Sequence, residues 1–100
     1  EQLQDYYVTP KEMIWGQHSY YVYVMEHPYR DKIRFRLGEA GIGTNIHYAN
    51  PAHLTPAFKK WCKSLPVTEQ LSRNIFSIPN YPHLTDSQVE YIADKCKELR

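Results

Sequence analysis

The run from Gly41 to Trp61 (GIGTNIHYANPAHLTPAFKKW) constrains the fold more than any other part of this sequence. Over residues 42–48, β-branched and aromatic side chains alternate with glycine, asparagine and histidine. This period of two predicts a strand with an apolar face toward the helices and a polar face opposite. Pro51 and Pro56 then bracket a loop, and residues 57–62 can add a short helical turn. The run therefore predicts a strand and a loop, in that order.

The rest of the chain alternates between predicted strands and helices. Residues 19–25 (SYYVYVM) predict a strand, because β-branched and aromatic side chains favour extended backbone. Residues 29–39 carry apolar side chains at helical spacing, and a second helix over 66–75 opens with proline at a first-turn position. Residues 76–78 predict a short third strand. A capping-box pattern at residues 85–88 begins a last helix, whose apolar stripe is Val89, Ile92, Cys96 and Leu99.

This order of elements predicts the fold class α/β (α+β). We expect a small, mostly antiparallel or mixed sheet of about three strands, with helices packed on one face. The chain has 100 residues, of which 42% are hydrophobic and 14% aromatic, enough for one domain with a thin core. Residues 1–17 show no sustained period and are interpreted as a lead-in, and residues 18–100 as the domain itself.

Charge and cysteine content limit the classes of function. A formal net charge of +1 argues against a nucleic-acid binder, which needs a concentrated positive field. Cys62 and Cys96 are too few for a secreted disulfide scaffold, so a reduced, cytoplasmic setting is expected. No apolar run reaches the roughly 18 residues that cross a membrane. The first residue, Glu1, is not a methionine, which suggests a piece of a longer protein.

The polar face of the predicted 42–48 strand is the candidate site. Asn45 and His47 lie on the same side of this strand, and Tyr48 and His53 follow in the chain. Amide, imidazole and phenol groups recognise hydroxyls and carbonyls, so these four residues are the predicted substrate-binding set. The structural alternative is that His47 caps a strand end and His53 bonds a loop carbonyl.

Other chemistries have weaker support. His47, His53, His83 and Cys62 match no standard zinc spacing, so no metal ligand is predicted. No motif supports a catalytic cysteine, and no catalytic residue is assigned. The basic residues of 30–36 are interpreted as a solvated helix face. The tyrosines of 20–23 are interpreted as packing residues, because the signature of RNA-binding sheets is missing.

Seven short motifs along the chain occur in one particular order. They are His18–Tyr23, Gly41–Thr44, His47–Tyr48, Pro51–Leu54, Leu65–Glu69, Ser77–Pro82 and Leu84–Val89. In this order they resemble the C-terminal region of the DegT/DnrJ/EryC1/StrS family of sugar aminotransferases. The chain departs from the family pattern at Ala49–Asn50, where proline often follows His-Tyr, and at Met25–Glu26, where the strand commonly ends in arginine.

The resemblance implies the C-terminal small domain of a fold-type I aminotransferase that acts as a homodimer. Such enzymes use pyridoxal phosphate to move an amino group from an amino acid, usually glutamate, to a keto-sugar nucleotide, as in lipopolysaccharide biosynthesis. In the family, the large domain supplies the Schiff-base lysine and the phosphate cup. The chain is therefore expected to form part of the substrate wall and to be inactive alone. The alternative is a stand-alone small α/β binding or regulatory interaction module.

Overall fold

The structure is a computed structural model that describes residues 2–99. In chain order its elements are β1 (Tyr23–Glu26), α1 (Arg30–Glu39), the 3₁₀ helices η1 (Ala52–Leu54) and η2 (Pro56–Trp61), α2 (Pro66–Asn74), β2 (Ile75–Ile78) and α3 (Asp86–Glu98). Over these described residues, no helix combines the length and the apolar character that crossing a membrane requires. Cys62 is exposed, Cys96 is buried, and both thiols are free.

β1 and β2 form an antiparallel pair in which Met25 lies opposite Phe76. Single bridges extend this pair on either side, from Val8 to Glu26 and from Asn45 to Ser77. The small α+β class is therefore confirmed, but the predicted strand over 42–48 is reduced to one bridging residue.

The sequence of β2 and of the loop explains why this ladder is so short. If the register of the Asn45–Ser77 bridge continued, the next hydrogen-bonding pair would place Gly43 opposite Pro79. Proline has no N–H to donate, so the ladder ends on that side. On the other side the chain turns at His47–Tyr48, where the peptide bond is cis.

A glycine turn places the start of the 42–46 segment against the core. Gly41 has φ of +80°, the left-handed conformation that glycine adopts without a steric penalty. Its N–H donates to the Gly38 carbonyl, and the Ile42 N–H donates to the Leu37 carbonyl at 2.9 Å. This is the Schellman arrangement at the end of α1, and it includes the apolar contact between Ile42 and Leu37, both of which lie in the core.

The core lies between one face of the β1–β2 pair and the helices α1 and α3. Its buried hydrophobic members are Leu3, Tyr7, Met25, Ile33, Leu37, Ile42, Phe76, Ile92 and Cys96. The predicted apolar stripes are confirmed in part: Ile33, Leu37, Ile92 and Cys96 are buried, whereas Tyr29 and Val89 are exposed. The capping box of Thr85 and Gln88 is confirmed. The 1–17 segment supplies two core residues, whereas its Trp15 is 84% exposed. Its division from residues 18–100 stays a prediction.

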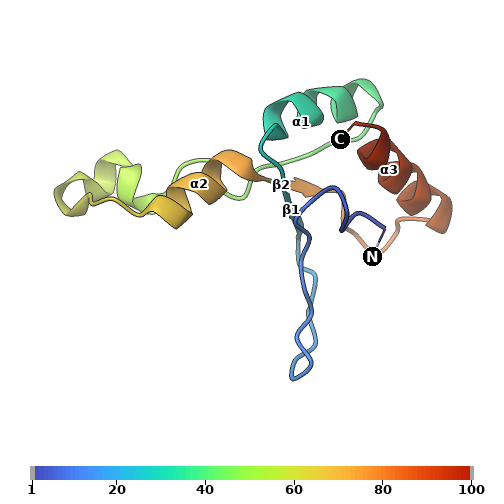
Figure 1. Ribbon diagram of the computed structural model, residues 1–100, viewed down its shortest axis with the longest axis horizontal. Helices are drawn as coiled ribbons and strands as arrows, with labels where there is room; N and C mark the ends of the chain where they lie inside the picture. Colours follow the sequence, from blue (N-terminus) through green and yellow to red (C-terminus); the bar gives the residue numbers. More distant parts are fainter. Residues whose placement is uncertain (1, 100) are drawn as a thin grey trace.

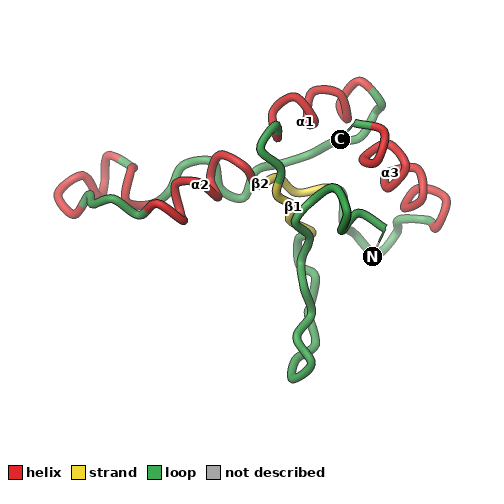
Figure 2. The backbone as a smooth tube through the Cα atoms, viewed as in Figure 1, coloured by secondary structure: helices red, strands yellow, loops and turns green. Residues whose placement is uncertain are grey.

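Two arms project from this body, as Figures 1 and 2 show. One is the segment between Val8 and β1, and the other carries η1, η2 and α2. None of these three helices contains a buried residue, so α2 does not cover the sheet as the sequence predicted. The radius of gyration is 15.2 Å, above the about 13 Å typical of a 100-residue domain. The arms therefore make the molecule less compact than an ordinary domain of its length.

One buried hydrogen bond joins the N-terminal segment to α3. The Tyr7 hydroxyl donates to the Cys96 carbonyl oxygen at 2.6 Å. Burial, followed by the nearby Cys96 thiolate charge, raises the pKa of Tyr7 to about 12. Burial likewise raises the pKa of the Cys96 thiol to about 11. Folding therefore favours the protonated, neutral form of the Tyr7 hydroxyl and of the Cys96 thiol.

These shifts predict a loss of stability in alkali. Because both folded pKa values lie above the ordinary 10.0 and 9.0, the stabilisation is complete below about pH 9. It is lost as the pH rises through about 11 and 12. Thermal unfolding across this range should show a falling midpoint, and Tyr7→Phe should flatten the fall and cost about 1 kcal/mol at neutral pH. Tyr21→Phe, at an 86% exposed tyrosine, is the control, and an equal effect of both variants would contradict the assignment.

Candidate functional site

A polar cluster lies on the sheet face opposite α1 and α3. The Asn45–Ser77 bridge exchanges both backbone hydrogen bonds, at 3.1 and 2.7 Å, so the two side chains share this face. His47, two residues further on, reaches back over Ser77: its Nδ1 lies 3.0 Å from the Ser77 Oγ. The Nε2 of the same ring lies 3.3 Å from the Asn45 Nδ2. Two of the four predicted substrate-binding residues are therefore brought together, around a serine.

Thr44, the residue before Asn45, faces the other side of the sheet and fixes this arrangement. Thr44 faces α1, where its hydroxyl accepts a hydrogen bond from the Arg34 Nε at 3.0 Å. The Arg34 Nη2 also donates to the Thr44 carbonyl oxygen at 3.3 Å. Because side chains alternate along extended backbone, anchoring Thr44 to α1 turns Asn45 toward the other face.

A cavity of about 360 Å³ adjoins the cluster. Its volume is within the range of small-molecule sites, about 300–1,000 Å³. It is lined by Tyr21, Val22, Gly43, Thr44, Asn45, His47, Ser77, Ile78, Pro79 and Asn80. None of these residues is a lysine or an arginine. The cavity thus offers amide, imidazole and hydroxyl hydrogen-bonding groups beside apolar walls.

Tyr48 and His53 lie outside this cavity. The Tyr48 side chain is 78% exposed, with its ring edge-on to His47 at a centroid distance of 5.7 Å. His53 is nearly buried, and its Nε2 lies 2.9 Å from Glu69 Oε1 at the start of α2. The hydrogen bond from His53 and then that from the Leu65 N–H lower the pKa of the Glu69 carboxyl. His53 therefore fastens η1 to α2, and its contact with a substrate stays a prediction.

Sequence reasoning missed Ser77 as a member of the site. It lies between two apolar residues of β2 and is only 5% exposed, because chain segments pair with it on both sides. Its position between Phe76 and Ile78 was the available signal, since period-two alternation puts it on the face away from the core. The bridge to Asn45, which brings Asn45 and His47 next to Ser77 on that face, is not visible in the sequence.

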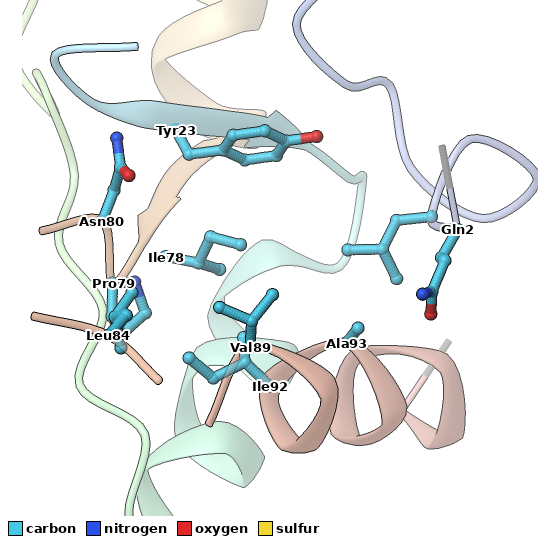
Figure 3. Close-up of a pocket in the computed structure, with 10 residues that line it drawn as sticks. Gln2, Tyr23, Ile78, Pro79, Asn80, Leu84, Val89, Ile92 and Ala93 are labelled. Atoms are coloured by element: carbon cyan, nitrogen blue, oxygen red, sulfur yellow. The ribbon is translucent and has the colours of Figure 1, made fainter. Parts of the chain in front are cut away.

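A second cavity, of about 290 Å³, lies on the helical side of the sheet. Figure 3 shows Val89, Ile92 and Ala93 projecting from α3 toward Tyr23 and Ile78. Its walls are mostly apolar and it lacks a cluster of converging polar side chains. It is therefore a weaker candidate for recognition of a polar ligand.

Covalent attachment of pyridoxal phosphate does not fit the described part of the chain. Such attachment requires a lysine beside the reacting centre. Within residues 2–99 none of the lysines is buried, and none lines the Asn45–His47–Ser77 cavity. Among these residues, no three acidic, histidine or cysteine side chains are grouped so that they could hold a metal ion.

Solved structures share this fold closely. A DegT DnrJ EryC1 StrS aminotransferase from Brucella abortus superposes with a TM-score of 0.91 at 28% identity, over 97% of this chain and 27% of that one. The S. venezuelae protein DesV superposes with a TM-score of 0.87 at 29% identity, over 92% of this chain and 26% of that one.

Sequence comparisons agree with the structural ones. A dTDP-3-amino-3,4,6-trideoxy-alpha-D-glucose transaminase from Micromonospora megalomicea is 39% identical over 84% of this chain and 24% of its own length. A pleiotropic regulatory protein from Geobacillus stearothermophilus is 34% identical over 99% of this chain and 27% of its own length. The chain thus spans about a quarter of the length of these relatives. Residues 2–97 match the DegT/DnrJ/EryC1/StrS aminotransferase family, and the chain therefore belongs to that family.

Proposed function

We propose that this chain is the substrate-binding C-terminal lobe of a pyridoxal-phosphate-dependent sugar aminotransferase. The whole protein would transfer an amino group from an amino acid, with glutamate as the expected donor, to a keto-sugar nucleotide. Relatives named as transaminases of dTDP-linked and UDP-linked sugars support this substrate class. A homodimer, a cytoplasmic location and a role in amino-sugar or lipopolysaccharide biosynthesis belong to the same proposal.

The observation that carries the proposal is the polar cluster, free of lysine and arginine, beside the 360 Å³ cavity. Asn45, His47 and Ser77 provide hydrogen-bonding groups of the kind that recognise hydroxyl and carbonyl oxygens. In the proposal they bind and orient the sugar, while Tyr48 covers the exposed rim and His53 holds the η1 loop in place. We assign none of them a proton transfer. Pyridoxal phosphate would supply the electron sink from outside this lobe.

Reduction of the full-length protein with borohydride tests the proposed activity. We expect one phosphopyridoxyl-lysine, mapped by peptide mass spectrometry to a position outside residues 2–99, because no lysine here adjoins the cavity. Amino transfer from glutamate to a nucleotide-linked keto-sugar is the companion assay. An adduct on a lysine within residues 2–99 would overturn the assignment of this chain as the accessory lobe. Absence of any adduct in the full-length protein would contradict the proposed aminotransferase activity.

Replacement of His47 tests the role of the cluster. His47→Ala in the full-length protein should lower kcat/KM about tenfold, mostly through KM, because one organising hydrogen-bonded ring is lost from the cavity wall. His83→Ala is the matched control, since His83 is exposed and does not line the cavity. Equal kinetics for the two variants would contradict a role of His47 in substrate binding and leave it a structural residue.

A further inference from the structure

The orientation of the Asn45 side-chain amide is fixed by a backbone group. The Ile46 N–H lies 2.8 Å from one terminal atom of Asn45, which must be the acceptor oxygen, Oδ1. A backbone N–H can only donate, so the opposite assignment would place two donors together. The amide nitrogen Nδ2 therefore faces His47, at 3.3 Å from its Nε2.

This orientation selects the tautomer of His47. Because the Asn45 Nδ2 is a donor, the neutral imidazole must accept at Nε2 and carry its proton on Nδ1. The Nδ1–H then donates to the Ser77 Oγ at 3.0 Å. The hydrogen bonds run in one direction, from the Ile46 N–H through Asn45 and His47 to Ser77.

The chain of hydrogen bonds leaves two donors without a partner among the described residues. With its oxygen accepting from His47, the Ser77 hydroxyl has its own proton free, and residues 2–99 place no other hydrogen-bond partner on Oγ. Ser77 borders the 360 Å³ cavity, so this proton is available to a molecule that occupies it. The second proton of the Asn45 Nδ2 is a neighbouring donor on the same face.

We propose that Ser77 is a substrate-contacting residue whose hydroxyl, oriented by Asn45 and His47, donates to an uncharged oxygen of the sugar. This inference rests on the proposed function, because it names the part of the nucleotide-sugar that the cavity receives. The diphosphate is the less suitable occupant, since no lysine or arginine lines the cavity. Two neutral donors suit a sugar hydroxyl or a keto oxygen instead.

The tautomer is tested by nitrogen NMR on full-length protein labelled with ¹⁵N-histidine. A protonated ring nitrogen and an unprotonated one have distinct shifts, and the His47 signals are identified by their absence in His47→Gln. At about pH 9, above the ordinary histidine range, the proton is expected on Nδ1. Asn45→Asp keeps an acceptor for the Ile46 N–H but turns a second acceptor toward Nε2, so Nε2 should become protonated. A proton on Nε2 in the unmodified protein, or no change in Asn45→Asp, would overturn the inference.

The ligand contact is tested by calorimetric binding to full-length protein. Ser77→Ala should lower the affinity for dTDP-glucose or UDP-glucose, whichever binds, about tenfold. The affinity for dTDP and UDP without the sugar should not change. Ser77→Thr, which keeps the hydroxyl, should restore the affinity to within about threefold. Equal weakening of the sugar nucleotides and the bare nucleotides would refute the sugar contact, as would a Ser77→Ala variant with unchanged affinity.

The two tests separate this inference from the proposed function. A protein that binds none of these nucleotide sugars and performs no amino transfer would remove the proposed function and, with it, the sugar contact. The NMR readout does not depend on turnover and would still decide the direction of the hydrogen-bond chain.

Discussion

Replacing Phe76 with alanine is expected to destabilise the domain by about 3–5 kcal/mol, the range for removing a fully buried aromatic ring. Phe76 is 0% exposed and sits at the centre of β2, opposite Met25. Its ring also meets that of Tyr7 edge-on, with centroids 6.1 Å apart. Since the N-terminal segment, the sheet and both body helices all meet in this core, the surrounding side chains cannot collapse into the space without moving several elements.

The measurement is urea unfolding of the 100-residue chain, followed by far-UV circular dichroism, because Trp15 and Trp61 are too exposed to report on the core. Phe35→Ala is a matched control, since it deletes the same ring from a position that is 68% exposed on α1. It should change the unfolding free energy by no more than about 0.5 kcal/mol. Similar losses in the two variants would show that Phe76 does not anchor the core.

The helices and strands that local signals specify were predictable from sequence. The capping box at the start of α3, the proline that opens α2 and the buried positions Ile33 and Leu37 of α1 are all found as expected. Each signal depends on residues a few positions apart, so a single sequence contains it. Ile75 marks the limit of this reasoning: it continues the apolar spacing of α2 but begins β2 instead.

The length of the strand pairing between residues 42–48 and β2 was not predictable, because it depends on segments far apart in the chain. The alternation over 42–48 placed Asn45 and His47 on one face, as their shared contacts with Ser77 bear out. The length of the ladder, however, is set by Pro79, which lies opposite Gly43 only once the register is known. His53 shows the same limit, since its partner Glu69 lies in α2.

The basic residues of α1 illustrate how a periodic pattern can hide a buried charge. The sequence suggested a solvated face, and this interpretation is wrong for Arg30, whose side chain is 10% exposed. Its Nη1 donates to the carbonyl oxygens of Ser72 at 2.5 Å and of Ile75 at 3.2 Å. These carbonyls lie where α2 gives way to β2, so Arg30 fastens the base of the projecting arm to α1.

Arg30→Ala is accordingly expected to cost about 2–3 kcal/mol, because hydrogen bonds from a charged donor are strong and the carbonyls lose a buried partner. The ion pair with Asp31 adds little to this figure, since that carboxylate is 79% exposed. The loss should appear in urea unfolding of the 100-residue chain. Hydrogen exchange should also quicken at the end of α2, where the carbonyls are freed.

Two variants at and near Arg30 distinguish the guanidinium geometry from charge alone. Arg30→Lys keeps the charge, but its single ammonium lacks the planar fork of donors, so less than half of the stability should return. Arg36→Ala removes the same side chain from an exposed position of α1, where its Nε is 3.8 Å from Glu39 Oε2, and should cost at most about 0.5 kcal/mol. If Arg36→Ala lowered the unfolding free energy as much as Arg30→Ala, the effect would come from removing any positive charge from α1 and not from the buried contacts of Arg30. If it is not, the junction between α2 and β2 is held by one buried arginine, and the arm carrying η1, η2 and α2 is positioned from α1.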